Sequence, residues 1–307
     1  MRITAIRTDR LVVPLDPPFP AAWDPEPRTR FAVTLVRVET DEGVVGVGSG
    51  DTMDGFAAFE HLFVGEDPLA IDRHVRVLET IDFHAGRYWP LEAALWDIAG
   101  QVAGQPVAAL FGGAQDGIPA YASCGVLLPA AERAESALRL CAEGFRALKI
   151  RVDPRRLEEG IAAVAATREA VGERMEIMVD LNQGWRMAGD VTPPIDVATA
   201  RAIAERLAEL GVLWLEEPLD GADLAGLRAL RAAVPGIRIA GGEMTRTSRE
   251  LDAALDADAF DVHQPDVVLA AGMANGRRLA ERALARGRWY SPHTWTNGIG
   301  LLANLHV

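Results

Sequence analysis

The sequence predicts an α/β protein: a barrel of parallel strands and helices in residues 116–307, preceded by an α+β domain in residues 1–115. The length of 307 residues is enough for two domains, or for one large barrel with an appendage. Short β-like runs alternate with amphipathic helices through the second region, a pattern typical of a parallel sheet. The first region lacks this alternation and changes once, from β-rich to helical. These observations place the domain boundary near residue 115.

The first domain is predicted to begin with two β-rich segments, residues 3–15 and 31–48. The second segment contains an Asp-Glu-Gly sequence that favours a hairpin turn. The stretch between the segments, residues 15–30, is rich in proline and has no periodicity. We therefore expect a long loop there, of the kind that often acts as a lid. Residues 66–111 are predicted to be helical, and a Gly-Gly pair ends the last helix.

Seven strand–helix repeats are predicted for the barrel. An open, doubly wound sheet would share this alternation, but no GxGxxG sequence follows the first strand, so a closed barrel is favoured. A complete barrel of this type has eight strands, and the chain ends at Val307 within the seventh helix. We therefore expect the barrel to be incomplete at its C-terminus. The predicted strands are residues 118–126, 145–152, 175–182, 212–218, 237–243, 259–266 and 288–293.

The composition excludes several classes of protein. The chain has 31 Lys and Arg against 44 Asp and Glu, a net charge of −13, which argues against a nucleic-acid surface. Two cysteines cannot form a disulfide framework and indicate a reducing compartment. No apolar run reaches the roughly 18 residues of a membrane span, and charges interrupt the N-terminus too often for a signal peptide. We expect a cytoplasmic protein without nucleic-acid or membrane partners.

Polar side chains are predicted at the C-terminal ends of consecutive barrel strands, where the catalytic groups of such barrels lie. Acidic residues on three adjacent strands would converge on one point. Because this set offers only oxygen ligands and no cysteine, it suits a hard octahedral cation such as Mg²⁺. The polar residues at these strand ends are Lys149, Arg151, Asp180, Asn182, Glu216, Glu217, Glu243, Asp266 and His293.

Several motifs occur in a fixed order along the chain: EAALWDIAGQVAGQPVAALFGG, LKIR, VDLNQGW, LEEP, GGE, QPD and SPH. In this order they resemble the mandelate racemase subgroup of the enolase superfamily, over essentially the whole chain. The resemblance implies an α+β capping domain over a modified (β/α)7β barrel. It also implies Mg²⁺ as cofactor, with Asp180, Glu216 and Glu243 as ligands and Glu217 as the less favoured member of its pair.

The reaction that the resemblance implies is removal of the proton next to a carboxylate, through an ene-diolate that Mg²⁺ stabilises. Lys149 would help to offset the charge that develops on the substrate. His293 would act as the base, and Asp266 would keep the other ring nitrogen of His293 protonated. These residues and Arg151 form the predicted catalytic set.

Arg151 stands where many relatives have the second lysine of a Lys-x-Lys pair. A guanidinium is effectively always protonated, so it is a poor base and a good clamp for carboxylate or hydroxyl groups. A site with one competent base favours dehydration of a sugar acid to a 2-keto-3-deoxy acid. Two alternatives stay open: a racemase or epimerase acting at the same carbon, and an inactive, incomplete barrel that serves as a scaffold through its exposed sheet edges.

Substrate specificity is expected from two N-terminal segments, residues 21–30 and 50–55, that would close over the barrel mouth. Arg28 and Arg30 in the first segment are candidates to meet a distal carboxylate. Barrels of this family are commonly multimers, so we expect a homo-oligomer that binds a small carboxylate. Candidate pocket residues are Asn182, Trp185, Arg246 and Trp295. Histidines expected to have only structural roles are His61, His74, His84, His263 and His306.

Overall fold

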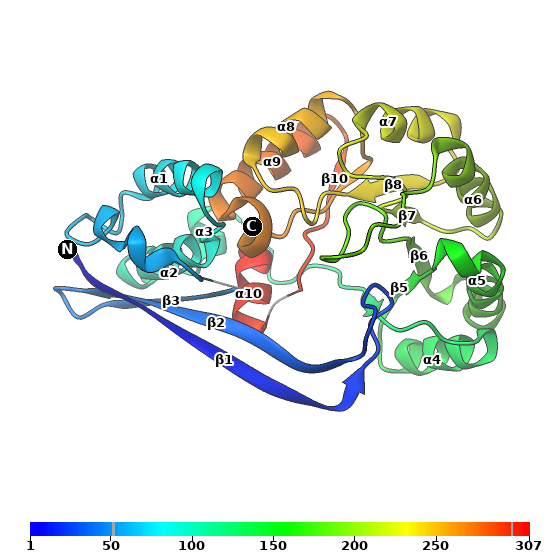
Figure 1. The fold of residues 1–307 in the computed structure, drawn as a ribbon, viewed down its shortest axis with the longest axis horizontal. Helices are drawn as coiled ribbons and strands as arrows, with labels where there is room; N and C mark the ends of the chain where they lie inside the picture. The colour runs from blue at the N-terminus through cyan, green and yellow to red at the C-terminus, as the bar shows by residue number, and fades with distance from the viewer. Residues whose placement is uncertain (51–52, 114, 296) are drawn as a thin grey trace.

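The N-terminal part of the chain folds into a lobe with a sheet on one side and helices on the other (Figure 1). The computed structural model describes residues 1–50, 53–113, 115–295 and 297–307. Within these residues the lobe has an antiparallel three-stranded sheet in the order β1 (Ile3–Phe19), β2 (Arg28–Thr40), β3 (Val45–Gly50). The expected hairpin turn joins β2 and β3, whose ladder runs from Glu39↔Val45 to Thr34↔Gly50.

The long loop predicted for residues 15–30 is largely wrong. β1 and β2 extend into it, and their pairing reaches Phe19 opposite Arg28, which leaves only residues 20–27 as the hairpin tip. Proline is tolerated in β1 because this strand lies at the edge of the sheet, where a missing N–H need not break the ladder. The hairpin tip reaches the barrel, where the backbone N–H of Ala22 donates to the carbonyl of Gly125 at 2.9 Å.

The helical prediction for residues 66–111 is confirmed, with breaks between three helices. They are α1 (Ile71–His84), α2 (Trp89–Ala103) and α3 (Val107–Leu110). Helix α2 lies directly on β3, and two glycines permit this approach. A Cβ at Gly46 would lie 2.1 Å from the carbonyl oxygen of Ala94, and one at Gly48 would lie 2.0 Å from that of Pro90. Any side chain at either position would therefore push the helix away from the sheet.

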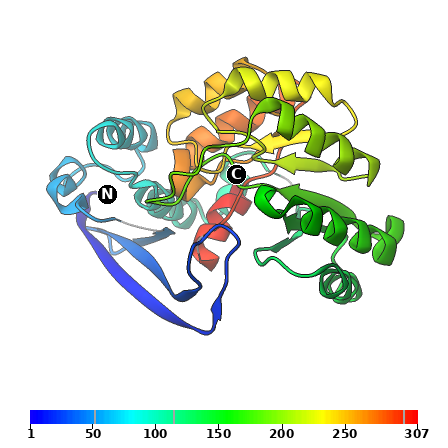
Figure 2. The same ribbon diagram turned by 45° about the vertical axis from the view of Figure 1, so that its right-hand side comes forward.

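The rest of the chain forms a curled parallel sheet that confirms the predicted fold class. Within the described residues it has seven strands, and each pairs with its neighbour in sequence from β4 to β10. The hydrophobic core lies between this sheet and the helices that cover its outer side (Figures 1 and 2). The strands are β4 (Ala122–Cys124), β5 (Ala147–Arg151), β6 (Glu176–Asp180), β7 (Trp214–Glu216), β8 (Arg238–Gly241), β9 (Val262–His263) and β10 (Trp289–Tyr290).

The helix after β10 lies between the two lobes in both views (Figures 1 and 2). Asn297 begins this helix and donates to the hydroxyl of Ser49 in β3 at 2.6 Å. No helix within the described ranges is long and apolar enough to cross a membrane. The barrel helices are α4 (Ala130–Ala142), α5 (Leu157–Val171), α6 (Val197–Glu209), α7 (Leu224–Ala233), α8 (Ser248–Asp256), α9 (Met273–Ala285) and α10 (Gly298–His306), with a π-helical turn at Val267–Ala271.

Candidate active site

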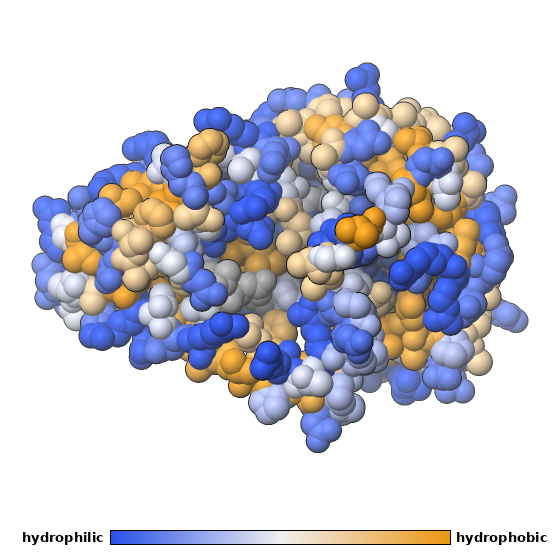
Figure 3. Space-filling model, in the orientation of Figure 1, coloured by the Kyte–Doolittle hydropathy of each residue, from blue (hydrophilic) through white to orange (hydrophobic). Residues whose placement is uncertain are grey.

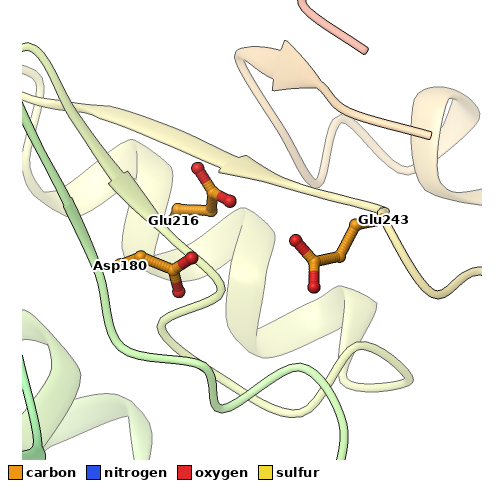
Figure 4. Close-up of side chains that lie close together, drawn as sticks. All are labelled: Asp180, Glu216 and Glu243. Atoms are coloured by element: carbon orange, nitrogen blue, oxygen red, sulfur yellow. The ribbon is translucent and has the colours of Figure 1, made fainter. Parts of the chain in front are cut away.

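Three carboxylates meet at the C-terminal ends of adjacent strands. Asp180 ends β6, Glu216 ends β7 and Glu243 follows β8. One carboxylate oxygen of each lies within 4.8 Å of the others, and all three residues are buried (Figure 4). Parallel pairing explains this meeting, since Asp180 lies opposite Glu216 in the ladder between β6 and β7. These residues are called the carboxylate triad below.

Two cations from β5 lie against the triad. The Lys149 ammonium contacts Glu216 Oε1 and lies 3.3 Å from Asp180 Oδ2, and only 1% of the lysine side chain is exposed. The Arg151 guanidinium contacts the same Asp180 oxygen. Burial raises the pKa of Glu216, but the positive charges of Lys149 and Arg151 outweigh burial and hold this pKa below its usual range. Glu216 is therefore anionic at neutral pH despite its burial.

The triad has the chemistry of a site for a hard divalent cation. Glu216 Oε2 is held by Trp214 Nε1 at 3.1 Å and Gln264 Nε2 at 2.9 Å, so Oε1 is the oxygen that faces the cluster. Glu243 Oε1 accepts from Trp185 Nε1 at 2.9 Å, whereas no described residue donates a hydrogen bond to its buried Oε2, and His293 Nε2 lies 3.4 Å from that oxygen. Burial of a carboxylate oxygen without a hydrogen-bond donor costs free energy unless a cation contacts that oxygen. An all-oxygen set of three carboxylates suits Mg²⁺.

Glu217 lies outside the triad although it is adjacent to Glu216. Its backbone has a positive φ of 46°, and its carboxylate lies against Gly184, where a Cβ would be 2.5 Å from Oε1. Burial, followed by the charges of Glu243 and Glu216, raises the pKa of Glu217 well above its usual range. The left-handed backbone thus turns the second carboxylate of the pair away from the cluster.

A histidine–aspartate dyad faces the triad from β10 and β9. His293 Nδ1 lies 3.1 Å from Asp266 Oδ2, and His293 Nε2 lies 3.4 Å from Glu243 Oε2. Asp266 is fully buried, and its other oxygen accepts from Asn304 Nδ2 at 3.0 Å and from the Val268 N–H at 3.1 Å. Burial lowers the pKa of His293, but Glu243 and Asp266 together outweigh it and the net shift is upward. The dyad directs Nε2 towards the metal site.

A cavity of about 220 Å³ lies beside the triad and the dyad, and both lobes line it. Trp23 and Arg28 reach it from the hairpin. Arg151 stacks on the Trp23 ring at 4.8 Å, and Arg28 stacks on the Trp295 ring at 4.9 Å. Figure 3 shows the surface hollowed between the two lobes. The described lining residues are Trp23, Arg28, Arg151, Asn182, Trp185, Met187, Glu243, Met244, Leu269, His293 and Trp295.

The candidate pocket residues separate into two groups. Asn182, Trp185 and Trp295 line this cavity, as does Arg28. Arg246 instead lines a different cavity of about 400 Å³, and its backbone N–H donates to Glu250 at 3.1 Å. Arg30 is exposed on β2 and is not among the described residues of the lining. The predicted segment 50–55 includes residues 51–52, which lie outside the described residues.

Several residues that support the site have little signal in the sequence. Trp23 is a lone tryptophan in a proline-rich stretch, and Asn304 lies in the last helix, far from Asp266 along the chain. Gln264 could have been found from the sequence, since it is the first residue of the QPD motif. The histidines expected to be structural include His263, which packs edge-on against Phe260 at 5.7 Å. Burial lowers the pKa of His263 to about 4.

A buried carboxylate triad beside a His–Asp dyad, at the mouth of a parallel barrel, defines a class of metal-assisted acid–base enzymes. Residues 7–112 match the model of the mandelate racemase / muconate lactonizing enzyme N-terminal domain, and residues 132–307 match the enolase C-terminal domain-like model. The chain therefore belongs to the enolase superfamily, in its mandelate racemase / muconate lactonizing enzyme group. The family predicted from the motifs is confirmed.

Similar proteins catalyse more than one reaction. The chain is 31% identical to a D-galactarolactone cycloisomerase of Agrobacterium fabrum, over 99% of this chain and 82% of the relative. It is 29% identical to an L-talarate/galactarate dehydratase of Salmonella typhimurium, over 87% and 69%. A solved racemase from Streptomyces coelicolor with bound magnesium superposes with a TM-score of 0.84 at 29% identity, over 99% and 86%. The prediction of an enzyme of this superfamily is confirmed, and its reaction is a separate question.

Proposed function

We propose that this protein is a Mg²⁺-dependent enzyme that removes the α-proton of a carboxylate substrate and dehydrates a sugar acid to a 2-keto-3-deoxy acid. The observation that carries the proposal is that one imidazole and one guanidinium line the same cavity. His293 has a nitrogen free to take a proton, whereas Arg151 is tied to Asp180 and stays protonated. A single base suits elimination better than inversion, which in its usual form uses two.

Asp180, Glu216 and Glu243 would hold the cation. When bound, Mg²⁺ offsets the negative charge that develops on the substrate carboxylate as the α-proton leaves. Lys149 adds a fixed positive charge beside the triad, and its burial makes that charge effective. Mg²⁺-containing structures of relatives, such as the Streptomyces coelicolor racemase, support this choice of metal.

His293 would carry both proton transfers. The Nδ1 atom faces Asp266, so Nε2 takes the α-proton as the C–H bond breaks. The imidazolium then gives this proton to the β-hydroxyl, the C–O bond breaks and water leaves, and the enol product becomes the 2-keto acid. Asp266 stabilises the imidazolium between the two transfers. One imidazole that acts first as base and then as acid gives a complete elimination without a second base.

A racemase or epimerase remains the second candidate, because it would use the same metal site and the same base, and one solved relative is a racemase. We keep two further expectations from the sequence as proposals, a cytoplasmic location and a homo-oligomeric state.

Proton NMR in D2O with Mg²⁺ tests the proposal, using pools of aldonates, aldarates and simple 2-hydroxy acids. A 2-keto-3-deoxy product from one acid is the expected result. Exchange of the α-proton or formation of an epimer without loss of water would support the racemase instead. If no acid exchanges its α-proton although Mg²⁺ binds, the proposal is wrong.

A further inference from the structure

We infer that the hairpin end of the active-site cavity selects acids with a single carboxylate, so that aldonates are preferred to aldarates. The structural basis is the pairing of Arg28 with Asp24, which neutralises the cation that would otherwise attract a second carboxylate. This inference rests on the proposed function, because it concerns the substrate class of the same site.

Arg28 is held on two sides. Its Nε contacts Asp24 Oδ2, and its Nη2 lies 3.1 Å from Asp24 Oδ1, so the pair is bidentate. The Asp24 side chain is only 6% exposed, which keeps its charge beside the guanidinium and away from water. The flat face of the guanidinium stacks on Trp295 at 4.9 Å. A bidentate pair of this kind holds the guanidinium in one position, and the carboxylate offsets its positive charge.

Arg28 lines this cavity from its hairpin side, and Asp24, which contacts Arg28, lines a neighbouring cavity of about 520 Å³. Arg28 comes from the start of β2, whereas Glu243 and His293 come from the barrel mouth, and all three line the same cavity. A substrate whose reacting carboxylate lies at the triad therefore extends towards Arg28. The other guanidinium of the described lining belongs to Arg151, and it is already in contact with Asp180.

Charge then distinguishes the two classes of acid. The second carboxylate of an aldarate would lie beside Arg28 and so close to the charge of Asp24, and the burial of Asp24 leaves the repulsion between the two carboxylates poorly screened. A terminal hydroxyl of an aldonate adds no charge and can accept a hydrogen bond from the guanidinium. The rings of Trp23 and Trp295 offer apolar surface to the carbon chain.

The test compares aldonates with aldarates of the same configuration, gluconate with glucarate and galactonate with galactarate. The Mg²⁺-loaded protein is assayed for α-proton exchange, for kcat/KM and for binding by intrinsic fluorescence, since three tryptophans line the cavity. We expect wild type to favour the aldonate about tenfold or more, which is about 1.4 kcal/mol or more. Asp24→Asn frees Arg28 and is expected to raise the relative kcat/KM for the aldarate about tenfold.

Glu26→Gln is the matched control, because Glu26 is exposed in the same hairpin tip and the substitution removes the same charge. The double variant Asp24→Asn/Arg28→Gln should lose the gain in aldarate activity. The inference is overturned if the wild type uses aldarates as well as aldonates. It is also overturned if Asp24→Asn and Glu26→Gln show the same preference between the two classes of acid. Both results leave the proposed function intact. If neither class binds or exchanges, the proposed function itself fails. Should Asp24→Asn not fold, the wild-type preference alone decides.

Discussion

Asn304 and Asp266 are joined by a hydrogen bond of 3.0 Å from Nδ2 to Oδ1, which connects the last helix to the His293–Asp266 dyad. The side-chain Oδ1 of Asn304 in turn accepts from the N–H of Val267 at 3.0 Å. Asp266 Oδ2 is left for His293 Nδ1 and for the N–H of Trp295, each at 3.1 Å. The orientation of the base thus depends on a helix that lies between the two lobes.

Removal of this support should slow the chemistry without removing the metal. Asn304→Ala leaves Asp266 Oδ1 with one donor fewer, so we expect kcat to fall about tenfold, since a misoriented base transfers protons less well. KM should change little, and the unfolding free energy should fall by about 1–3 kcal/mol. Steady-state kinetics and chemical denaturation measure these effects. Leu302→Ala on the exposed side of the same helix is the control, and equal losses in both variants would contradict the role of Asn304.

The base itself is tested by His293→Asn, which retains a polar side chain but cannot take up a proton at neutral pH. We expect α-proton exchange and turnover to fall by about 10²–10⁴. The stabilisation by Mg²⁺ should remain, because the triad is intact. NMR exchange in D2O and thermal unfolding measure the two properties, and His61→Asn at an exposed position is the control. Turnover retained by His293→Asn would show that the dyad is not the base.

Mg²⁺ should stabilise the fold through the triad. A ligand that binds only the folded state adds about 2.7 kcal/mol at one hundred times its Kd. Glu243→Gln removes one charged ligand and should abolish most of the thermal shift. A titration of Tm against Mg²⁺ at constant ionic strength measures the effect, with Glu173→Gln at an exposed site as the control. A wild-type Tm that does not respond to Mg²⁺ would rule out the triad as a metal site.

Lys149 should matter for stability as well as for chemistry. Lys149→Met leaves Asp180 and Glu216 buried beside one cation fewer, and the loss of one partner of a buried pair costs about 3–5 kcal/mol. Mg²⁺ should restore part of this loss, because it neutralises the same carboxylates. Denaturant unfolding with and without Mg²⁺ checks both statements. Arg201→Met breaks a largely exposed pair and should cost less than about 1 kcal/mol.

Glu92 should make stability depend on pH. It is fully buried on α2, and it accepts from the N–H groups of Met273 and Ala274 at 2.9 and 2.8 Å and from Trp96 Nε1 at 3.0 Å. Burial raises the pKa of Glu92 to about 7, a shift that the three donors oppose and the nearby Glu79 assists. The folded state therefore binds the proton more tightly than the unfolded state.

The resulting contribution is fully present below the unfolded pKa of about 4.5 and is lost as the pH rises to about 7. Relative to Glu92→Gln, the unfolding free energy of the wild type should fall by up to about 3 kcal/mol over this range and change little above it. Denaturation at a series of pH values gives this difference. A difference that rises with pH would mean that Glu92 is held as the carboxylate by its donors.

The predicted site agrees best with the structure where the prediction rests on residues that are close together in the sequence. Asp180 and Glu216 directly follow short apolar runs, and Glu243, Asp266 and His293 lie two or three residues beyond the ends of strands. Parallel strands in sequence order bring these ends together. The prediction for residues 15–30 failed because proline content indicates which backbone angles single residues can adopt, and does not indicate which segments pair as strands. The edge position of β1, which makes its prolines harmless, follows from the order of the sheet.

Contacts made across the fold could not be predicted in the same way. Arg246 follows β8 as Asn182 follows β6, yet the path of its loop carries it to a different cavity. Asp24 and Arg28 are four residues apart, but their pairing in a buried position depends on the hairpin tip meeting the barrel. Asn304 reaches Asp266 only because α10 packs between the lobes.

The sequence by itself determined the family, the order of the barrel strands and the three carboxylates of the candidate metal site, because each of these follows from local patterns repeated along the chain. The tertiary structure alone decided which cations are neutralised, how far the hairpin extends and what holds the base in place. Those properties depend on distances between residues far apart in the chain, which are set by packing between the two lobes. The predicted substrate preference therefore follows from the structure, and the predicted chemistry from the sequence.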